Sequence, residues 1–194
     1  MFFWKRLDHP GHDSCRLFKL PDGWRLSGAA VFRDENGPCH FLYDVFTDPA
    51  WKTRCAMVSG YLGRKPVALR IRSPEAGRWS VNGLRAKDVD GCIDIDLAFT
   101  PATNLIALRR LRLEVGQRAE TTAAWLRFPE MRLARLFQRY RRTGRTEYRY
   151  EAPAENYAGT LLVQPSGAVI LYPGFFEMVT SGRDARTKGK RGNP

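Results

Sequence analysis

GCIDIDLAFTPATNLIALRRL, residues 91–111, is the stretch from which we predict the fold. Apolar residues at every second position from 93 to 97 alternate with Asp94 and Asp96. This period of two is typical of a β-strand that buries one face. Pro101 interrupts the strand, because proline lacks the amide hydrogen that a sheet needs. An apolar run follows at 105–108, so we predict two strands about a polar corner.

Charged side chains flank this corner, with Asp94 and Asp96 before it and Arg109 and Arg110 after it. The two carboxylates share one face of the predicted strand, and like charges so close raise one pKa unless cations neutralise them. Three interpretations fit: an ion-paired polar network, a ligand site, or the acid–base pair of an enzyme. Residue chemistry alone leaves all three open.

Short apolar or alternating runs with turn residues between them occupy the chain on both sides of this stretch. The predicted strands are 24–32, 39–46, 51–59, 66–72, 124–128, 147–151, 157–164 and 167–172. Asn36-Gly37, Asn82-Gly83 and Pro165-Ser166-Gly167 predict hairpins. Many short strands without helical alternation are typical of a sandwich or barrel, so we predict an all-β, single-domain protein over residues 1–180.

Two local features of this pattern carry specific expectations. Gly28 lies inside a predicted strand, where a glycine often marks a bend or a bulge. In 131–140, MRLARLFQRY, the apolar spacing of three and four residues favours a helix, although an extended conformation is also possible.

The bulk composition limits the classes of function. The net charge of +12 favours acidic partners such as phosphate, nucleic acid, anionic lipid or a sugar acid. Part of this charge lies in the basic tail 181–194, which we expect to be disordered. The four cysteines form no C-x-x-C pair and the three histidines have no metal-ligand spacing, so we expect free thiols, no metal and no cofactor.

The beginning of the chain, MFFWKRLDHPG, bears on location. Its apolar run is shorter than the roughly 7–15 residues of a secretory signal, and no stretch approaches the roughly 18 of a membrane span. We therefore expect a cytoplasmic protein. Peripheral membrane contact through Phe2, Phe3 and Trp4 is an alternative to a first strand packed on the core.

Segment 132–150 combines basic and aromatic residues. Its members are Arg132, Arg135, Arg139, Arg141, Arg142, Arg145 and Arg149, with Phe137, Tyr140, Tyr148 and Tyr150 among them. Phosphate contact and base stacking require such a mixture, so a single-stranded nucleic acid is one candidate partner. An anionic glycolipid head group needs similar chemistry, and a solvated strand face would look the same.

The sequence also resembles a family of glycolipid-binding bacterial proteins of unknown function. The matching segments are 48–54 (DPAWKTR), 77–79 (GRW), 91–97 (GCIDIDL), 100–104 (TPATN), 109–111 (RRL), 138–140 (QRY), 148–151 (YRYE) and 172–174 (YPG). The resemblance implies a strongly curved antiparallel sheet, barrel-like or half-barrel, similar to lipoprotein carriers of the bacterial envelope. It also implies that 131–140 is a strand, and we follow it there. The family pattern has Thr-Leu-Pro-Ile where this chain has residues 105–108, so we expect a straighter strand.

From the residues and the resemblance together we expect a non-enzymatic binder of an amphipathic, anionic lipid or glycolipid. Its acyl part is expected on the concave apolar face of the sheet. The expected ligand-binding residues are Trp51, Trp79, Asp94, Asp96, Thr100, Thr103, Asn104, Arg109, Arg110, Arg139 and Tyr140. A nucleic-acid module using 132–150 is the first alternative. An enzyme that acts on a sugar derivative, with Asp94 and Asp96 as acid and base, is the second. The oligomeric state is left open.

Overall fold

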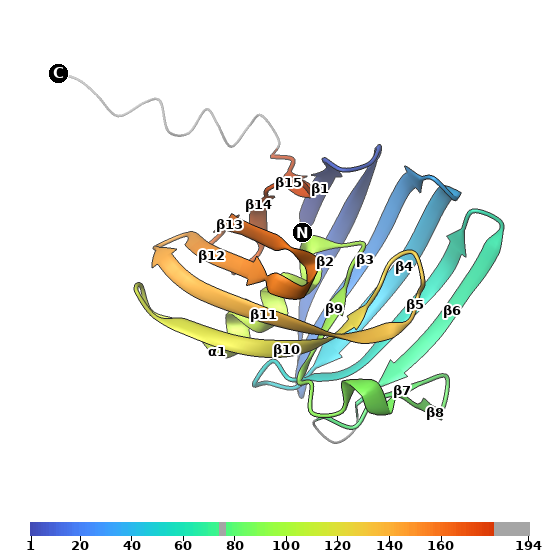
Figure 1. Cartoon of the computed structure of the whole chain (residues 1–194), viewed down its shortest axis with the longest axis horizontal. Helices are drawn as coiled ribbons and strands as arrows, with labels where there is room; N and C mark the ends of the chain where they lie inside the picture. Colours follow the sequence, from blue (N-terminus) through green and yellow to red (C-terminus); the bar gives the residue numbers. More distant parts are fainter. Residues whose placement is uncertain (74–76, 181–194) are drawn as a thin grey trace.

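The protein is all-β, as predicted, and its strands form one open, strongly curved sheet (Figure 1). A computed structural model describes residues 1–73 and 77–180; the expected disorder of 181–194 lies outside this range. The first group of strands is β1 (Phe2–Arg6), β2 (Gly11–Leu20), β3 (Gly23–Asp34), β4 (Gly37–Thr47), β5 (Thr53–Leu62), β6 (Lys65–Arg72), β7 (Ser80–Val81) and β8 (Leu84–Arg85). The second is β9 (Asp94–Leu97), β10 (Arg118–Leu126), β11 (Leu133–Gly144), β12 (Glu147–Ala152), β13 (Tyr157–Val163), β14 (Val169–Tyr172) and β15 (Phe176–Met178).

The strands follow chain order in two meanders that meet where β1 pairs with β15. Every pair in the sheet is antiparallel except β9 with β10, which run parallel. Parallel neighbours need a crossover connection, and here the short helix α1 (Asn104–Leu111) provides it. Figure 1 shows β10 to β13 running across the direction of β2 to β6, so the concave side of the sheet is enclosed by two groups of strands.

Helix α1 corrects one prediction, because residues 105–108 are helical and not a second strand. Thr100 caps the short 3-10 helix η2 (Pro101–Thr103), which runs directly into α1, and Arg112 ends α1 in a left-handed conformation. Asn104 to Leu108 are all buried. Because these residues are enclosed, the apolar run 105–108 shows no alternation of polar and apolar positions, so it resembled a buried strand. The expected straighter strand is therefore wrong as well.

Segment 131–140 is extended in β11, which confirms the expectation from the family resemblance. The helix favoured by the apolar spacing is wrong. In this strand Leu136, Gln138 and Tyr140 are buried while Arg135 and Arg139 are exposed. This alternation is the period of a strand with one buried face.

Gly28 lies in an unbroken register between β2 and β4, so the expected bulge is wrong. The glycine makes room for a neighbouring side chain: a Cβ at position 28 would lie 2.3 Å from Cζ of Tyr43. The hairpins at Asn36-Gly37, Asn82-Gly83 and Pro165-Ser166-Gly167 are confirmed. The four cysteines are free, as predicted.

Two apolar cores fill the concave side of the sheet. The first lies between β1–β6 and β9 and includes Leu105 and Ile106 of α1. The second lies under β11–β14 and includes Ala107 and Leu108 of the same helix. The hollow expected to hold an acyl chain is thus largely filled by side chains of the strands together with α1.

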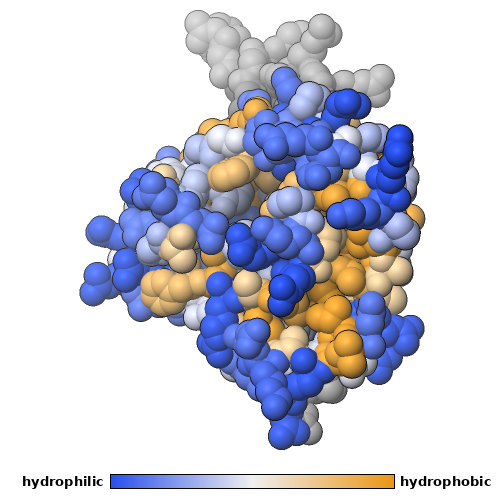
Figure 2. All heavy atoms as spheres, turned by 45° about the vertical axis from the view of Figure 1, so that its right-hand side comes forward, coloured by the Kyte–Doolittle hydropathy of each residue, from blue (hydrophilic) through white to orange (hydrophobic). Residues whose placement is uncertain are grey.

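Apolar side chains reach the surface beside the first core. Val67 and Leu69 on β6, together with Phe128, Met131 and Leu133 around the start of β11, are half-buried against it. Figure 2 brings the β5–β6 side forward and shows an apolar area bordered by charged residues. In the described ranges, no helix is long and apolar enough to cross a membrane.

Candidate ligand-binding site

A cleft of about 390 Å³ remains on the concave side, between the first turn of α1 and strands β10–β15. We call it the aromatic cleft; its main side chains are Arg6, Asp96, Thr100, Asn104, Trp125, Tyr150, Tyr157, Tyr172 and Phe175. Small-ligand sites are commonly about 300–1,000 Å³, apolar or aromatic, and carry a few placed polar groups. The cleft has this size and this composition.

Aromatic rings from four segments form one wall of the cleft. Tyr157 has its ring centroid 5.3 Å from that of Tyr172 and 5.3 Å from that of Phe175. Tyr150 stands edge-on to Tyr172 at 5.7 Å. These edge-to-face arrangements stabilise aromatic groups by about 0.5–1.5 kcal/mol per pair beyond area burial, so the wall is pre-formed.

Asp96 is the half-buried carboxylate of the cleft. Gln138 on β11 donates from Nε2 to Asp96 Oδ2 at 2.9 Å, and the same nitrogen lies 3.1 Å from the hydroxyl of Tyr150. Desolvation raises the pKa of Asp96 to about 6, the nearby Asp94 raises it further, and the hydrogen bond from Gln138 acts in the opposite direction. The carboxyl group thus takes up a proton just below neutral pH.

Asn104 places a buried amide at the first turn of α1, beside the ring of Tyr140. Burial raises the pKa of Tyr140 well above its ordinary value, and the Asn104 amide partly offsets this. In the part of the chain that the structure describes, the fully buried hydroxyl of Tyr140 makes no hydrogen bond. An unsatisfied buried hydroxyl costs about 1–3 kcal/mol, and such costs are often accepted at binding sites.

A second polar network lies behind the cleft and was absent from the sequence analysis. Thr100 donates its hydroxyl to Asp13, and Tyr43 donates to the same carboxylate at 3.1 Å. Arg6 is buried, donates to the carbonyl oxygen of Phe99 at 3.1 Å and pairs with Asp8. Desolvation raises the pKa of Asp13 to about 7, with the hydrogen bonds from Thr100 and Tyr43 acting in the opposite direction.

The raised pKa of Asp13 predicts a pH-dependent stability. The native carboxyl group binds a proton up to about pH 7 and the unfolded one only to about 3.8, so its stabilising contribution is complete at low pH and is lost as pH rises to about 7. We expect Asp13→Asn to abolish this part of the decline, at most roughly 4 kcal/mol. Urea unfolding of both proteins from pH 4.5 to 8.5 measures it.

Asp22→Asn is the matched control, because Asp22 is a solvent-exposed carboxylate, 72% exposed. This variant should keep the wild-type pH dependence. An Asp13→Asn protein whose stability falls with pH as steeply as the wild type would contradict the role of Asp13.

The structure separates the predicted site residues into groups. Only Asp96, Thr100 and Asn104 line the aromatic cleft, with Tyr140 next to it. Asp94 instead accepts two hydrogen bonds from Arg110, at 2.7 and 2.5 Å, and the same guanidinium reaches Thr121 at 2.7 Å. The carboxylates therefore have different partners, an arrangement that does not favour Asp94 and Asp96 as a catalytic pair.

The remaining predicted residues lie elsewhere. Thr103 accepts a hydrogen bond from the Leu97 amide at 3.2 Å, and Trp79 donates to the Cys92 carbonyl at 2.8 Å, so both brace the core. Arg139 lies on the outer face of β11. Trp51 and Arg109 line a different pocket.

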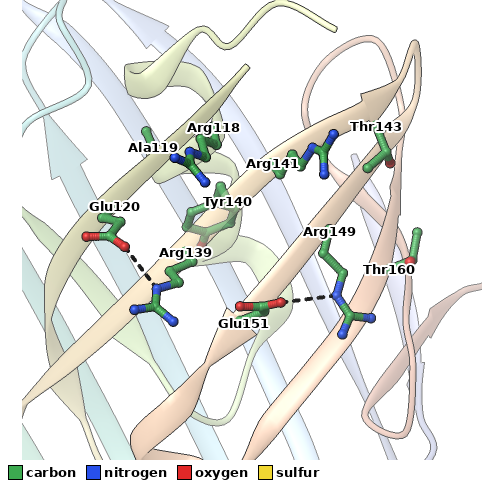
Figure 3. Close-up of a pocket in the computed structure, with 10 residues that line it drawn as sticks. All are labelled: Arg118, Ala119, Glu120, Arg139, Tyr140, Arg141, Thr143, Arg149, Glu151 and Thr160. Atoms are coloured by element: carbon green, nitrogen blue, oxygen red, sulfur yellow. Dashed lines mark hydrogen bonds and ion pairs between the residues drawn. The ribbon is translucent and has the colours of Figure 1, made fainter. Parts of the chain in front are cut away.

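The nucleic-acid alternative depends on arginines that lie on the outer face of β10–β13, among them Arg139, Arg141 and Arg149 (Figure 3). There Arg139 is paired with Glu120 at 2.9 Å and Arg149 with Glu151 at 3.3 Å. Strand alternation turns Tyr148 inward, as it does Tyr140 and Tyr150, and all three are buried. Of the aromatic side chains expected to stack on bases, only Phe137 shares the arginine face, where the Arg139 guanidinium lies over its ring, so most of the support for that alternative is removed.

Sequence reasoning missed the cleft residues Arg6, Trp125, Tyr157 and Tyr172, and also Gln138, which donates to Asp96. One signal was available: in 138–140 and 148–150, Gln138 and the tyrosines alternate with arginines, which places them on the opposite face of a strand. No grouping of three or more histidine, cysteine, aspartate or glutamate side chains that could hold a metal occurs in residues 1–73 and 77–180.

Together these observations define a class: a single-sheet all-β protein that wraps around one short helix and leaves an aromatic-lined cleft. The chain belongs to the family described as "Putative glycolipid-binding", whose match spans residues 1–178. It is also similar to the crystal structure, at 1.80 Å, of a DUF1089 family protein from Pseudomonas aeruginosa. That similarity has a TM-score of 0.76 and 30% identity over 85% of this chain and 91% of the other. No curated protein matches the chain.

Proposed function

We propose that this protein binds a glycolipid and that the aromatic cleft takes its sugar head group. The observation that carries the proposal is the presence of Asp96 and Asn104 in one cleft with the aromatic side chains of Tyr157, Tyr172 and Phe175. Sugar rings combine apolar C–H faces with hydroxyl groups, so they need both aromatic surface and hydrogen-bonding side chains. The description of the family supports the same class of ligand.

The lipid part lies outside the cleft in this proposal, since the two apolar cores fill the concave side of the sheet. Phe128 lines the cleft and also belongs to the half-buried apolar side chains beside the first core. The acyl chain extends from the cleft over this apolar surface. Each buried methylene contributes about 0.8 kcal/mol, so a glycolipid binds more tightly than its free sugar.

Native mass spectrometry of the protein purified from cells, followed by an array of glycolipids with neutral, acidic and phosphorylated sugars, tests the proposal. We expect a co-purifying lipid and a roughly tenfold or larger loss of binding in Trp125→Ala, since that ring borders the cleft. Phe137→Ala is the matched control, because Phe137 lies on the opposite face of the neighbouring strand β11.

Two results would count against this function. One is the absence of any bound lipid in both assays. The other is equal loss of binding in Trp125→Ala and Phe137→Ala, which would mean that the cleft is not the site.

A further inference from the structure

A second pocket, of about 350 Å³, lies at the opposite end of α1 from the aromatic cleft. Four arginines line it: Arg109 and Arg112 at the end of α1, and Arg142 and Arg145 around the end of β11. We call it the four-arginine pocket. It shares no lining residue with the aromatic cleft, so a ligand in this pocket would contact a different set of side chains.

The positive charge of this pocket is not neutralised by the protein. No aspartate or glutamate lines it, and within residues 1–73 and 77–180 none of its four arginines is in an ion pair. On the outer face of β10–β13, by comparison, Arg139 and Arg149 each have a glutamate partner. The carboxyl end of α1 attracts cations, but this attraction is only about 0.3–1 kcal/mol per charge.

Arg109 has a buried N–H group without a partner among residues 1–73 and 77–180. Its guanidinium lies 5.8 Å from the ring centroid of Trp51, and its Nε is shielded from solvent and makes no hydrogen bond to any of these residues. Guanidinium N–H groups are strong donors and have no acceptor capacity. A shielded donor of this kind is uncommon and calls for an explanation, and an acceptor group bound in the pocket supplies one.

Trp51 is held in an unusual conformation at this position. Its φ is 67°, in the left-handed region that bulky residues rarely adopt, and its ring stacks on Trp24 with centroids 4.7 Å apart. Such strain costs on the order of 1–3 kcal/mol and clusters at ligand sites. The stacked ring fixes the surface on which the Arg109 guanidinium lies.

Arg142 is anchored by backbone carbonyl groups and not by a carboxylate. It donates to the carbonyl oxygens of Leu113 and Arg145 at 2.8 Å each and to that of Gly144 at 3.3 Å. These bonds orient the guanidinium without cancelling its charge. The pocket therefore presents a fixed cation as well as the shielded donor of Arg109.

We infer that the four-arginine pocket is a binding site for a phosphate group, either inorganic phosphate or the phosphate ester of a larger ligand. The planar guanidinium fork matches the oxygens of a phosphate in paired hydrogen bonds. The pocket volume leaves room for a sugar-sized group attached to the phosphate.

The test compares thermal unfolding in sodium phosphate with that in sodium chloride at the same ionic strength, and repeats it with pyrophosphate and with glucose 6-phosphate. We expect phosphate to raise the melting temperature of the wild type by several degrees, since a ligand that binds only the folded state stabilises it. The double variant Arg109→Gln, Arg145→Gln should lose this rise. A larger rise with glucose 6-phosphate than with phosphate would identify an ester as the ligand.

The matched control is Arg118→Gln, Arg141→Gln, which removes the same charge from opposed positions on the outer face of β10 and β11. It should keep the phosphate response. The broadening of the phosphorus NMR signal of added phosphate by the wild type, with its loss in the first double variant, gives a second readout that does not depend on unfolding.

Two results would overturn the inference: no response to any of the three anions, or an equal response in both double variants. Glycolipid binding by the aromatic cleft should be unchanged in Arg109→Gln, Arg145→Gln, because the two pockets share no residue. Failure of one site is thus distinguishable from failure of the other.

Discussion

Replacing Arg110 with methionine is expected to lower the free energy of unfolding by about 3–5 kcal/mol, because the substitution leaves a buried charge without its partner. Asp94 has a side chain only 2% exposed and accepts both of its hydrogen bonds from Arg110. Urea unfolding at neutral pH measures the loss.

A double-mutant cycle identifies the origin of this effect. If the Asp94–Arg110 pair causes it, combining Arg110→Met with Asp94→Asn should cost clearly less than the sum of the two single changes. The matched control is Arg139→Met, whose guanidinium is 50% exposed and paired with an exposed glutamate; we expect a change below about 1 kcal/mol. Additive single effects, or an equal loss in the control, would refute the explanation.

Replacing Gly28 with alanine is expected to destabilise the protein by roughly 3 kcal/mol, which is at the upper end of the usual cost of overpacking. The new Cβ would lie 2.3 Å from Cζ of Tyr43 and 2.5 Å from the carbonyl oxygen of Ser14. Tyr43 cannot move away without breaking its buried hydrogen bonds to Asp13 and Thr100. The same unfolding measurement applies.

Gly144→Ala is the matched control for this change. It also adds a methyl group to a strand glycine, but its nearest neighbour is the Glu147 side chain at 3.3 Å, which is exposed and can shift. We expect an effect within about 0.5 kcal/mol. Similar losses in the two variants would show that Gly28 is not needed for the approach of Tyr43, and partial rescue of Gly28→Ala by Tyr43→Leu would support that need directly.

The candidate site was only partly predictable from the sequence. The acidic run placed Asp94 and Asp96 on one strand, and both lie in β9. Their different partners, Arg110 from α1 and Gln138 from β11, depend on how the sheet bends, and no local pattern contains that information. Arg109 and Arg110 are adjacent in the chain, yet the helix points one at Trp51 and the other at Asp94, because successive helical residues face different directions.

The sequence by itself determined the all-β class and the hairpins, because turn chemistry and a period of two are local properties of the chain. The helical state of 104–111, the filling of the concave side by the two cores and the aromatic cleft were decided only by tertiary structure. The physical reason is burial. Residues 104–108 are enclosed and so have no exposed face to reveal a helical period, and the cleft joins residues as distant as Arg6 and Tyr172, which the closure of β1 on β15 brings together.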